Sequence, residues 1–259
     1  MKIVFYTCNT GYNEGFVPNI LAELPENIDA FYLHDGCVPL YVDRGWSYID
    51  IRNFDGCPQK SLSLRQRFAK TLPHRFFPDA DWTIYLDQKY YLPRKFFDEM
   101  LSLINNKEGK TFFVPAHPKS RTFIEEVQFP FTNGTFSYDE ALNLLSFLKA
   151  NRMMPTDFIS TMACLLVRKN CPVNTAANER WFSLLDQAYT IEVRDQIFLP
   201  YTGAPLSLLN ELDPTTDYLG ELGGLWYHPA GYTSGRKRHQ PEMHRLEELE
   251  NAYNNLFSA

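Results

Sequence analysis

One short segment, residues 82–86 with the sequence WTIYL, constrains the fold more than any other part of the chain. Its β-branched and aromatic residues predict a buried strand, which the polar run 87–89, DQK, brings to an end. Open α/β sheets bind ligands just outside the carboxyl ends of their strands. Asp87 and Lys89 stand at such an end, and a carboxylate beside an ammonium suits a ligand that carries phosphate, with or without a metal. The alternative is a surface turn after the strand.

The order of the expected elements indicates an α/β fold. Strands are expected at 2–7, 28–33, 46–51, 82–86, 111–115 and 162–167, and helices at 17–24, 61–71, 94–104, 138–150, 177–189 and 241–256. This alternation predicts a Rossmann-type, mostly parallel sheet flanked by helices. The 259 residues allow one domain, 1–235, followed by a basic segment and a C-terminal helix at 236–259.

Several protein classes are disfavoured by composition and by missing motifs. The chain lacks GxGxxG and a Walker A lysine, which argues against a dinucleotide-binding Rossmann enzyme and a P-loop NTPase. Its net charge of −6 argues against a general nucleic-acid coat protein. The five cysteines form no CxxC pair, so we expect free thiols in a reducing cytosol rather than a zinc site. With no signal peptide and no apolar run near about 18 residues, we expect a cytoplasmic protein without a transmembrane segment.

Polar side chains follow four of the expected strands: Asp35, Asp87 with Lys89, His117 with Arg121, and Arg168. If the strands are mostly parallel, these ends meet at one edge of the sheet and form one site. Two of them have other readings. Asp35 is also a typical turn residue before a glycine, and His117 is equally a candidate for a buried structural histidine.

Four ordered blocks of sequence resemble one known family. Residues 70–78, KTLPHRFFP, and 82–87, WTIYLD, are similar to its "K-x-L-P-H-x-x-F-P … W-x-D" motif. His117-Pro118 with Arg121 and the pair 125–126 is similar to "H-P-x-R … Y-E-E". Leu165–Arg168 matches its apolar strand ending in arginine, and Trp181 with residues 194–196, RDQ, resembles "W-W … R-D-Q-L-S-F". This is the glycosyltransferase-like family of the TOD and MUCI proteins, formerly a domain of unknown function. The resemblance implies a GT-A-type fold and sugar transfer from a nucleotide donor.

We assign the candidate binding residues by their positions at the strand ends and on the basic helix before residue 82, and the resemblance adds His74 and Glu125. Predicted donor or nucleotide-binding residues are Thr7, Asn9, Asp35, Arg65, Lys70, His74, Asp87 and Lys89. Predicted acceptor or sugar-binding residues are His117, Arg121 and Glu125. A helix cap remains the other reading for His74.

Two hypotheses address the charge of the leaving nucleoside diphosphate. In the first, Asp87 binds Mn²⁺ or Mg²⁺ together with a distant histidine such as His228. In the second, Lys89 replaces the metal, helped by Lys70 or Arg65, and Asp87 holds ribose or sugar hydroxyls. The first is slightly favoured.

The predicted catalytic residues are Asp195, Arg194 and Glu126. Asp195 is the candidate base that takes the acceptor proton in an inverting transfer, with Arg194 fixing that carboxylate or a phosphate. A retaining enzyme does not need a base in the same place. Glu125 and Glu126 are together an alternative candidate for the catalytic base. The Arg194–Asp195 pair is also a candidate helix cap.

The sequence thus predicts a glycosyltransferase, hexosyl or pentosyl, that moves a sugar from a nucleotide-diphosphate sugar to a hydroxyl acceptor. A polysaccharide or glycolipid is the favoured acceptor. A hydroxylated DNA base is the less favoured one, and the run 236–239, RKRH, would then face the phosphate backbone. The rival readings are a nucleotidyltransferase on a similar scaffold and a catalytically silent nucleotide- or sugar-binding module. Donor base, stereochemistry and oligomeric state stay open.

Overall fold

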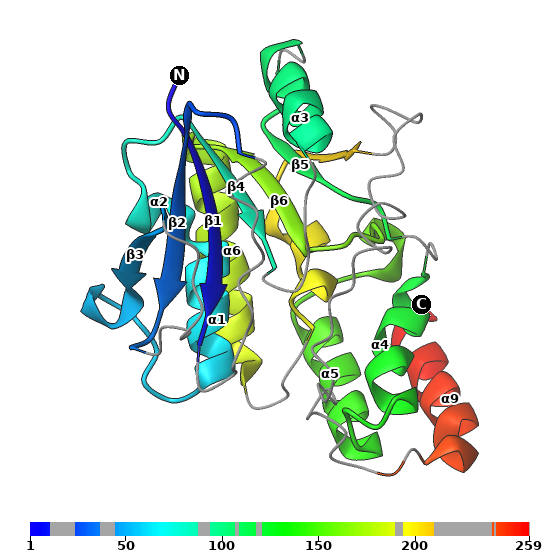
Figure 1. The fold of residues 1–259 in the computed structure, drawn as a ribbon. Helices are drawn as coiled ribbons and strands as arrows, with labels where there is room; N and C mark the ends of the chain where they lie inside the picture. Colours follow the sequence, from blue (N-terminus) through cyan, green and yellow to red (C-terminus); the bar gives the residue numbers. More distant parts are fainter. Residues whose placement is uncertain are drawn as a thin grey trace.

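The computed structural model describes residues 1–10, 24–36, 45–87, 94–106, 109–117, 121–189, 194–209, 240 and 242–258. These residues contain a seven-stranded sheet with helices packed on it (Figure 1). The strands are β1 (Ile3–Asn9), β2 (Ile28–His34), β3 (Ser47–Asp50), β4 (Trp82–Leu86), β5 (Phe112–Val114), β6 (Leu165–Lys169) and β7 (Leu206–Leu208). Their order across the sheet is β3-β2-β1-β4-β6-β5-β7.

Six of these strands point the same way, and β6 runs against them. β1 pairs in parallel with β2 and β4, β2 with β3, and β5 with β7, whereas β6 is antiparallel to both β4 and β5. The prediction of an α/β fold with a mostly parallel sheet flanked by helices is confirmed. The shared direction of β1, β2 and β4 brings their carboxyl ends to one edge of the sheet, which is where α/β proteins bind ligands.

The reversed direction of β6 corrects one inference from the sequence. Arg168 ends an apolar strand, but because β6 is antiparallel this end lies opposite Thr83, near the start of β4. Arg168 is also fully buried, with 1% of its surface exposed. It therefore belongs to the interior at the opposite end of the strands from Asp87, and not to the edge that carries the candidate site.

Five of the six predicted helices are present. They are α1 (Leu62–Thr71), α2 (Pro73–Phe76), α3 (Arg94–Asn106), α4 (Phe123–Thr132), α5 (Tyr138–Ala150), α6 (Pro172–Gln187) and α9 (Leu246–Phe257). Short 3₁₀ helices are η2 (Ile51–Asn53), η3 (Pro155–Asp157), η5 (Asp195–Ile197), η6 (Leu199–Thr202) and η7 (Met243–Arg245). Helices α6 and α9 begin at other residues than predicted, and helices α2 and α4 and strand β7 were not predicted. The helix expected at 17–24 lies almost wholly outside the described residues.

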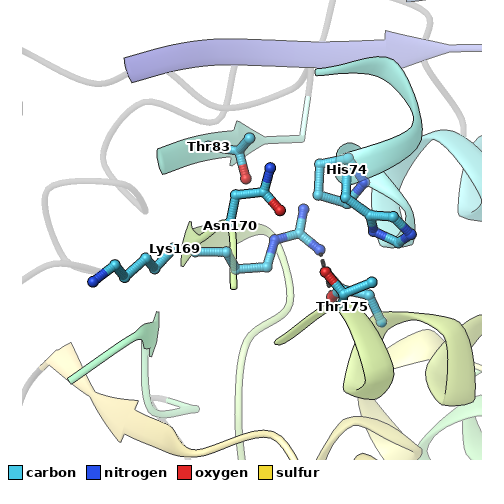
Figure 2. Close-up of a pocket in the computed structure, with 8 residues that line it drawn as sticks. His74, Thr83, Lys169, Asn170 and Thr175 are labelled. Carbon is cyan, nitrogen blue, oxygen red and sulfur yellow. Dashed lines mark hydrogen bonds between the residues drawn. The ribbon is translucent and has the colours of Figure 1, made fainter. Parts of the chain in front are cut away.

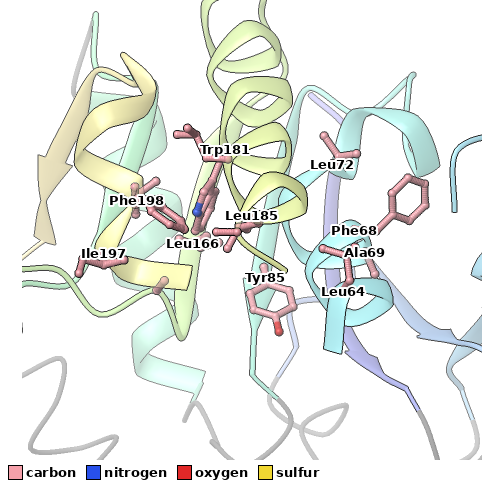
Figure 3. Close-up of a cluster of buried hydrophobic side chains, with 14 of the residues drawn as sticks. Leu64, Phe68, Ala69, Leu72, Tyr85, Leu166, Trp181, Leu185, Ile197 and Phe198 are labelled. Atoms are coloured by element: carbon pink, nitrogen blue, oxygen red, sulfur yellow. The ribbon is translucent and has the colours of Figure 1, made fainter. Parts of the chain in front are cut away.

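The core divides into two layers because side chains alternate along each buried strand. In β1, Val4, Tyr6 and Cys8 enter one cluster of buried residues, while Ile3 and Phe5 enter the other. Helices α1 and α6 cover the first face, and their side chains, such as Phe68 and Leu72 of α1 and Trp181 and Leu185 of α6, belong to the same cluster as Leu166 and Tyr85 (Figure 3). Helix α3 covers the second face with Phe97, Met100 and Leu103.

The C-terminal helix α9 packs beside α4 and α5 (Figure 1). Leu249 of α9 is fully buried, and the rings of Tyr253 and Phe257 lie 6.1 and 5.4 Å from the ring of Phe123, the first residue of α4. The helix predicted at 241–256 is therefore present, whereas the basic run 236–239 lies outside the described residues. Of the helices that the structure describes, none combines the length and the apolar character that crossing a membrane requires.

Candidate active site

A buried lysine joins two carboxylates at the carboxyl edge of the sheet. Lys70, from the last turn of α1, is 5% exposed. Its Nζ lies 2.5 Å from Oδ2 of Asp195, the first residue of η5, and 3.5 Å from Oδ1 of Asp87, which directly follows β4. The two carboxylates are about one-fifth exposed, at 22% for Asp87 and 21% for Asp195. Three of the residues predicted from the sequence therefore meet at one point.

Tyr85 orients Asp87 from within β4. Because side chains alternate along a strand, the residue two positions before Asp87 shares its side. The Tyr85 hydroxyl donates a hydrogen bond of 2.6 Å to Oδ1 of Asp87, and the Lys70 Nζ lies 5.3 Å from the centre of the Tyr85 ring. Burial raises the pKa of Tyr85 well above its usual value, so its hydroxyl keeps the proton that it donates.

The charges of this trio stabilise one another. Burial alone would lower the pKa of Lys70, but the negative charges of Asp195 and Asp87 outweigh it and raise that pKa. Burial alone would likewise raise the pKa of Asp195, but Lys70 and Arg67 outweigh it and lower that pKa. Lys70 is therefore an ammonium and Asp195 an ionised carboxylate at neutral pH.

Arg168 holds the backbone from which Lys70 projects. Its Nη2 donates to the Lys70 carbonyl at 2.8 Å and its Nη1 to the Thr71 carbonyl at 3.4 Å. The Tyr6 hydroxyl donates to the same Lys70 carbonyl at 2.9 Å. These carbonyls belong to the last turn of α1, where a cation also complements the negative end of the helix dipole. Opposite them, Trp181 Nε1 donates to the Asp195 carbonyl at 2.9 Å.

Other predicted donor residues line the same edge beside β1 and β2. Asn9 ends β1 and is buried, and Asp35 directly follows β2 and is 5% exposed. The Asp35 Oδ2 lies 3.4 Å from Nη1 of Arg65, whose Nε donates to the Pro58 carbonyl at 2.8 Å. Thr7 instead uses its hydroxyl within the sheet, where it donates to the Leu86 carbonyl at 2.8 Å.

A second charged cluster surrounds the buried carboxylate of Glu126. This residue of α4 is 1% exposed, and its Oε1 lies 2.6 Å from Nη1 of Arg194. Nη1 of Arg121 lies 3.4 Å from Oε2, and Gln196 Nε2 donates to Oε1 at 2.7 Å. Burial raises the pKa of Glu126, and the two arginines oppose that rise. Because this carboxylate is buried and paired, it organises the arginines around it.

Two predicted residues have local partners away from these clusters. His74 Nε2 lies 2.9 Å from Oε1 of Glu179, and His74 lines a small cavity with Thr83, Lys169 and Asn170 (Figure 2). This cavity of about 10 Å³ has room for a single water molecule and is too small for a sugar or a nucleotide. Glu125 closes a capping box with Thr122, whose backbone N–H donates to Oε2 at 2.7 Å.

The remaining candidates are His117, Lys89 and His228. His117 is buried three residues after β5, and its backbone N–H donates to the Ser160 carbonyl at 3.0 Å. Lys89 and His228 lie outside the described residues. The roles that we assigned to these three residues, and to His74 and Glu125, stay predictions.

The described residues do not by themselves fit a divalent cation. Among them, no three His, Cys, Asp or Glu side chains gather closely enough to hold a metal ion. The space between Asp87 and Asp195 is taken by the Lys70 ammonium, and Oδ1 of Asp87 already accepts from Tyr85. The Mn²⁺ or Mg²⁺ requirement stays a prediction, and we derive no step through a metal.

Sequence reasoning missed four residues that shape the site: Tyr85, Arg168 as a support, Trp181 as a donor to Asp195, and Gln196 as a donor to Glu126. Only Tyr85 had a usable signal, since its spacing of two from Asp87 in a strand places both side chains together. The other three act across contacts between distant elements, which no local pattern reveals.

Comparisons with known proteins bear on the fold. No sequence family and no curated protein matches the chain. Among solved structures, the apo form of WbbM, a bifunctional glycosyltransferase, superposes with a TM-score of 0.51 and 12% identity, over 80% of this chain and 38% of that one. The chain has a GT-A-like fold.

Two further solved structures align at lower scores. The galactosyltransferase LgtC, in complex with donor and acceptor sugar analogues, gives a TM-score of 0.46 at 10% identity, over 97% of this chain and 95% of that one. Mouse xyloside xylosyltransferase 1 gives 0.44 at 10% identity, over 79% of this chain and 84% of that one. The chain spans about 38% of the length of WbbM. The resemblance to the TOD and MUCI family stays a prediction beside the GT-A-like fold.

Proposed function

We propose that this protein transfers a sugar from a nucleotide-diphosphate sugar to a hydroxyl group of an acceptor. The observation that carries the proposal is the ion-paired trio Asp87–Lys70–Asp195 at the carboxyl edge of the parallel strands. In α/β folds this edge is the usual place for a nucleotide. The likeness of the fold to that of WbbM supports the reaction class.

The donor lies over the ends of β1, β2 and β4. There the carboxylate of Asp35, oriented by Arg65, accepts hydrogen bonds from ribose or base, and Asn9 lies beside it at the end of β1. Asp87 accepts hydroxyls of the ribose or of the transferred sugar. An ammonium carries three N–H donors, so Lys70 can pair with its two carboxylates and still meet an oxygen of the donor diphosphate.

The acceptor hydroxyl lies on the Asp195 side of the trio. In an inverting transfer the hydroxyl oxygen bonds to the sugar carbon, the bond from that carbon to the diphosphate breaks, and the hydroxyl proton passes to Asp195. As negative charge grows on the departing diphosphate, it draws Lys70 toward itself. Asp195 then loses part of its counter-charge and becomes a stronger base. Lys70 thereby couples departure of the diphosphate to deprotonation of the acceptor.

Calorimetric binding of a panel of nucleoside diphosphates and their sugars tests the donor site. We would compare the wild type with Asp87→Asn and with Asp81→Asn, a matched change just before the amino end of the same strand. We expect one nucleoside diphosphate to bind, at least about tenfold more weakly to Asp87→Asn, and equally well to wild type and Asp81→Asn. Arms with Mn²⁺, Mg²⁺ and chelator decide the metal requirement. Failure of every nucleotide to bind the wild type would overturn the proposal.

Turnover separates the rival readings. A silent binding module would bind the nucleoside diphosphate without releasing it from any sugar donor, with or without acceptors. A nucleotidyltransferase would consume a nucleoside triphosphate and release pyrophosphate. The proposal requires release of nucleoside diphosphate from the sugar donor that binds.

A further inference from the structure

An aromatic ring between two arginines marks a second surface beside the reaction centre. Phe129, on α4, is 36% exposed, and the guanidinium carbons of Arg121 and Arg194 lie 3.7 and 4.9 Å from the centre of its ring. Both guanidiniums also pair with the buried carboxylate of Glu126. We call this group of Arg121, Glu126, Phe129 and Arg194 the arginine cluster.

The arginine cluster is positively charged. Two guanidiniums face the single carboxylate of Glu126, which leaves an excess of one positive charge in a chain whose net charge is −6. Two further acids adjoin members of the cluster in the sequence. Glu125 is engaged by the backbone and hydroxyl of Thr122, and the Asp195 carboxylate lies 2.5 Å from the Lys70 ammonium. A local cation excess on an acidic protein focuses small anions toward that surface.

Arg121 carries more N–H donors than its contacts with the described residues use. Within the described part of the chain, Arg121 uses only Nη1 for a hydrogen bond, although a guanidinium carries five N–H donors. The side chains of Arg121 and Arg194 keep 12% and 28% of their surfaces exposed. Stacking on Phe129 and pairing with Glu126 fix the guanidinium planes. Fixed planes are what two-pronged recognition of a carboxylate or phosphate needs.

The position of the cluster assigns it to the acceptor. Arg194 immediately precedes Asp195, and Gln196 bonds to Glu126, so η5 joins the cluster to the trio. The donor edge is formed by β1, β2 and β4, whereas the cluster is carried by α4 and η5, beyond Asp195. A ligand that reaches both Asp195 and the cluster therefore approaches from the acceptor side.

We propose that the arginine cluster binds an anionic group of the acceptor, a sugar carboxylate or a phosphate, beside the hydroxyl that receives the transferred sugar. This inference rests on the proposed function, because only a glycosyltransferase has an acceptor. The preference of the cluster for anionic sugars can be measured without a donor. The acceptor is accordingly an acidic or phosphorylated glycan.

Binding of matched sugars tests the inference. We would titrate glucose, glucuronate and glucose 6-phosphate by calorimetry or ligand-observed NMR into wild type, Arg121→Gln, Arg194→Gln and the control Arg245→Gln. Arg245 is a suitable control because it also stacks on a ring, Tyr138 at 3.4 Å, pairs with glutamates and is 30% exposed, but lies on η7. We expect the wild type and the control to bind one anionic sugar at least about tenfold more tightly than glucose, with the difference shrinking at high salt. The two cluster variants should lose that preference.

The same variants separate failure of the inference from failure of the proposed function. If wild type shows no preference for either anionic sugar, or if the preference survives both substitutions, the inference is wrong. If Arg121→Gln weakens a nucleoside diphosphate as much as the anionic sugar, the cluster belongs to the donor and the inference is again wrong. Anionic-sugar preference without any nucleotide binding would support the subsite and contradict the proposed function.

A second kind of variant keeps both arginines, because removing either of them leaves the buried carboxylate of Glu126 short of a partner. Glu126→Gln replaces that carboxylate by an amide of the same size and raises the excess charge of the cluster. We expect it to bind the preferred anionic sugar several-fold more tightly than wild type, with glucose unchanged. Equal or weaker binding of the anionic sugar would overturn the inference.

Discussion

Lys70 is a single buried charge whose two carboxylate partners make its burial tolerable. An ammonium that is 5% exposed pays a desolvation cost, which Asp195 and Asp87 offset at 2.5 and 3.5 Å. The same contacts depress the pKa of Asp195. Lys70 therefore affects both the free energy of unfolding and the pKa of Asp195, and the two effects can be measured separately.

A double-mutant cycle in the free energy of unfolding measures the Lys70–Asp195 contact. Lys70→Met should destabilise the wild type by about 3 kcal/mol, the lower end for a broken buried pair because the carboxylates are partly exposed. In an Asp195→Asn background the cost should fall by at least about 1 kcal/mol. Lys149→Met is the control: its Nζ lies 5.5 Å from the Phe257 ring, a contact worth about 1 kcal/mol at most. Additive costs at Lys70 and Asp195 would show that the two do not interact.

Acid titration tests the direction of the Asp195 shift. A carboxyl whose pKa is lower in the folded than in the unfolded chain adds stability that is fully present above the unfolded value, about 3.9, and is lost as pH falls through the folded value. The stability gap between wild type and Asp195→Asn should therefore be constant from pH 7 to about pH 5 and shrink below about pH 4. Urea unfolding at several pH values checks this. In a Lys70→Met background most of that pH dependence should vanish, and a gap that widens in acid would contradict the assignment.

Sequence analysis predicted the residues of the Asp87–Lys70–Asp195 trio, but not which of them contact one another. Asp87 was found because a buried strand ends there, and Lys70 because it lies on the basic helix before that strand. Asp195 was found through the resemblance to a known family. That Lys70 points at Asp195 depends on how α1, β4 and η5 stack, which no local pattern encodes. Tyr85 was missed although its spacing in the strand placed it beside Asp87.

At the scale of elements, helix α4 carries two residues of the arginine cluster, Glu126 and Phe129. Thr122 caps this helix and forms a capping box with Glu125, so the first turn, which leads to Glu126, is fixed by local hydrogen bonds. Helix α5 begins in the same way, with Ser137 and Glu140. The two caps form a natural pair for comparison.

Thr122→Ala and Ser137→Ala should each lower the free energy of unfolding by about 1 kcal/mol, because each removes a helix cap. Only Thr122→Ala should also weaken binding of anionic sugars, since α4 alone carries Glu126 and Phe129. Chemical denaturation and ligand titration of the two variants measure both effects. Equal effects of the two variants on ligand binding would contradict a link between the α4 cap and the cluster.

The direction of β6 and the presence of helix α4 were not predicted from the sequence, for physical reasons. Residues 165–169 are buried apart from the last, and a buried apolar run has the same pattern whether the strand is parallel or antiparallel. Helix α4 was not predicted, and Pro130 stands in its last turn, where the missing N–H removes one i→i−4 hydrogen bond of the helix. The strands and helices with clear periodicity, such as β4 and α5, were found with the right bounds.

At the scale of the whole molecule, helices α4, α5 and α9 pack together beside the sheet, on the side to which we assign the acceptor (Figure 1). Helix α9 packs on α4 and α5, and Leu249 is its fully buried contact. Leu249→Ala should cost about 2–5 kcal/mol and speed hydrogen exchange in α4, α5 and α9 more than in β1 and β4. Leu62→Ala on α1, where the side chain is 50% exposed, is the control and should cost less than about 1 kcal/mol. Uniform exchange in every element would show that α9 does not stabilise this group selectively.

The measurement that tests the account most directly is turnover of the nucleotide-sugar donor by wild type, Lys70→Met and Lys149→Met. Release of nucleoside diphosphate should fall at least about 100-fold in Lys70→Met, because the trio loses the cation that faces the departing diphosphate, and stay unchanged in Lys149→Met. Circular dichroism and the melting temperature confirm that each variant is folded. A folded Lys70→Met variant with the turnover of the wild type would contradict the central claim that Lys70 joins the donor and acceptor sides of one active site.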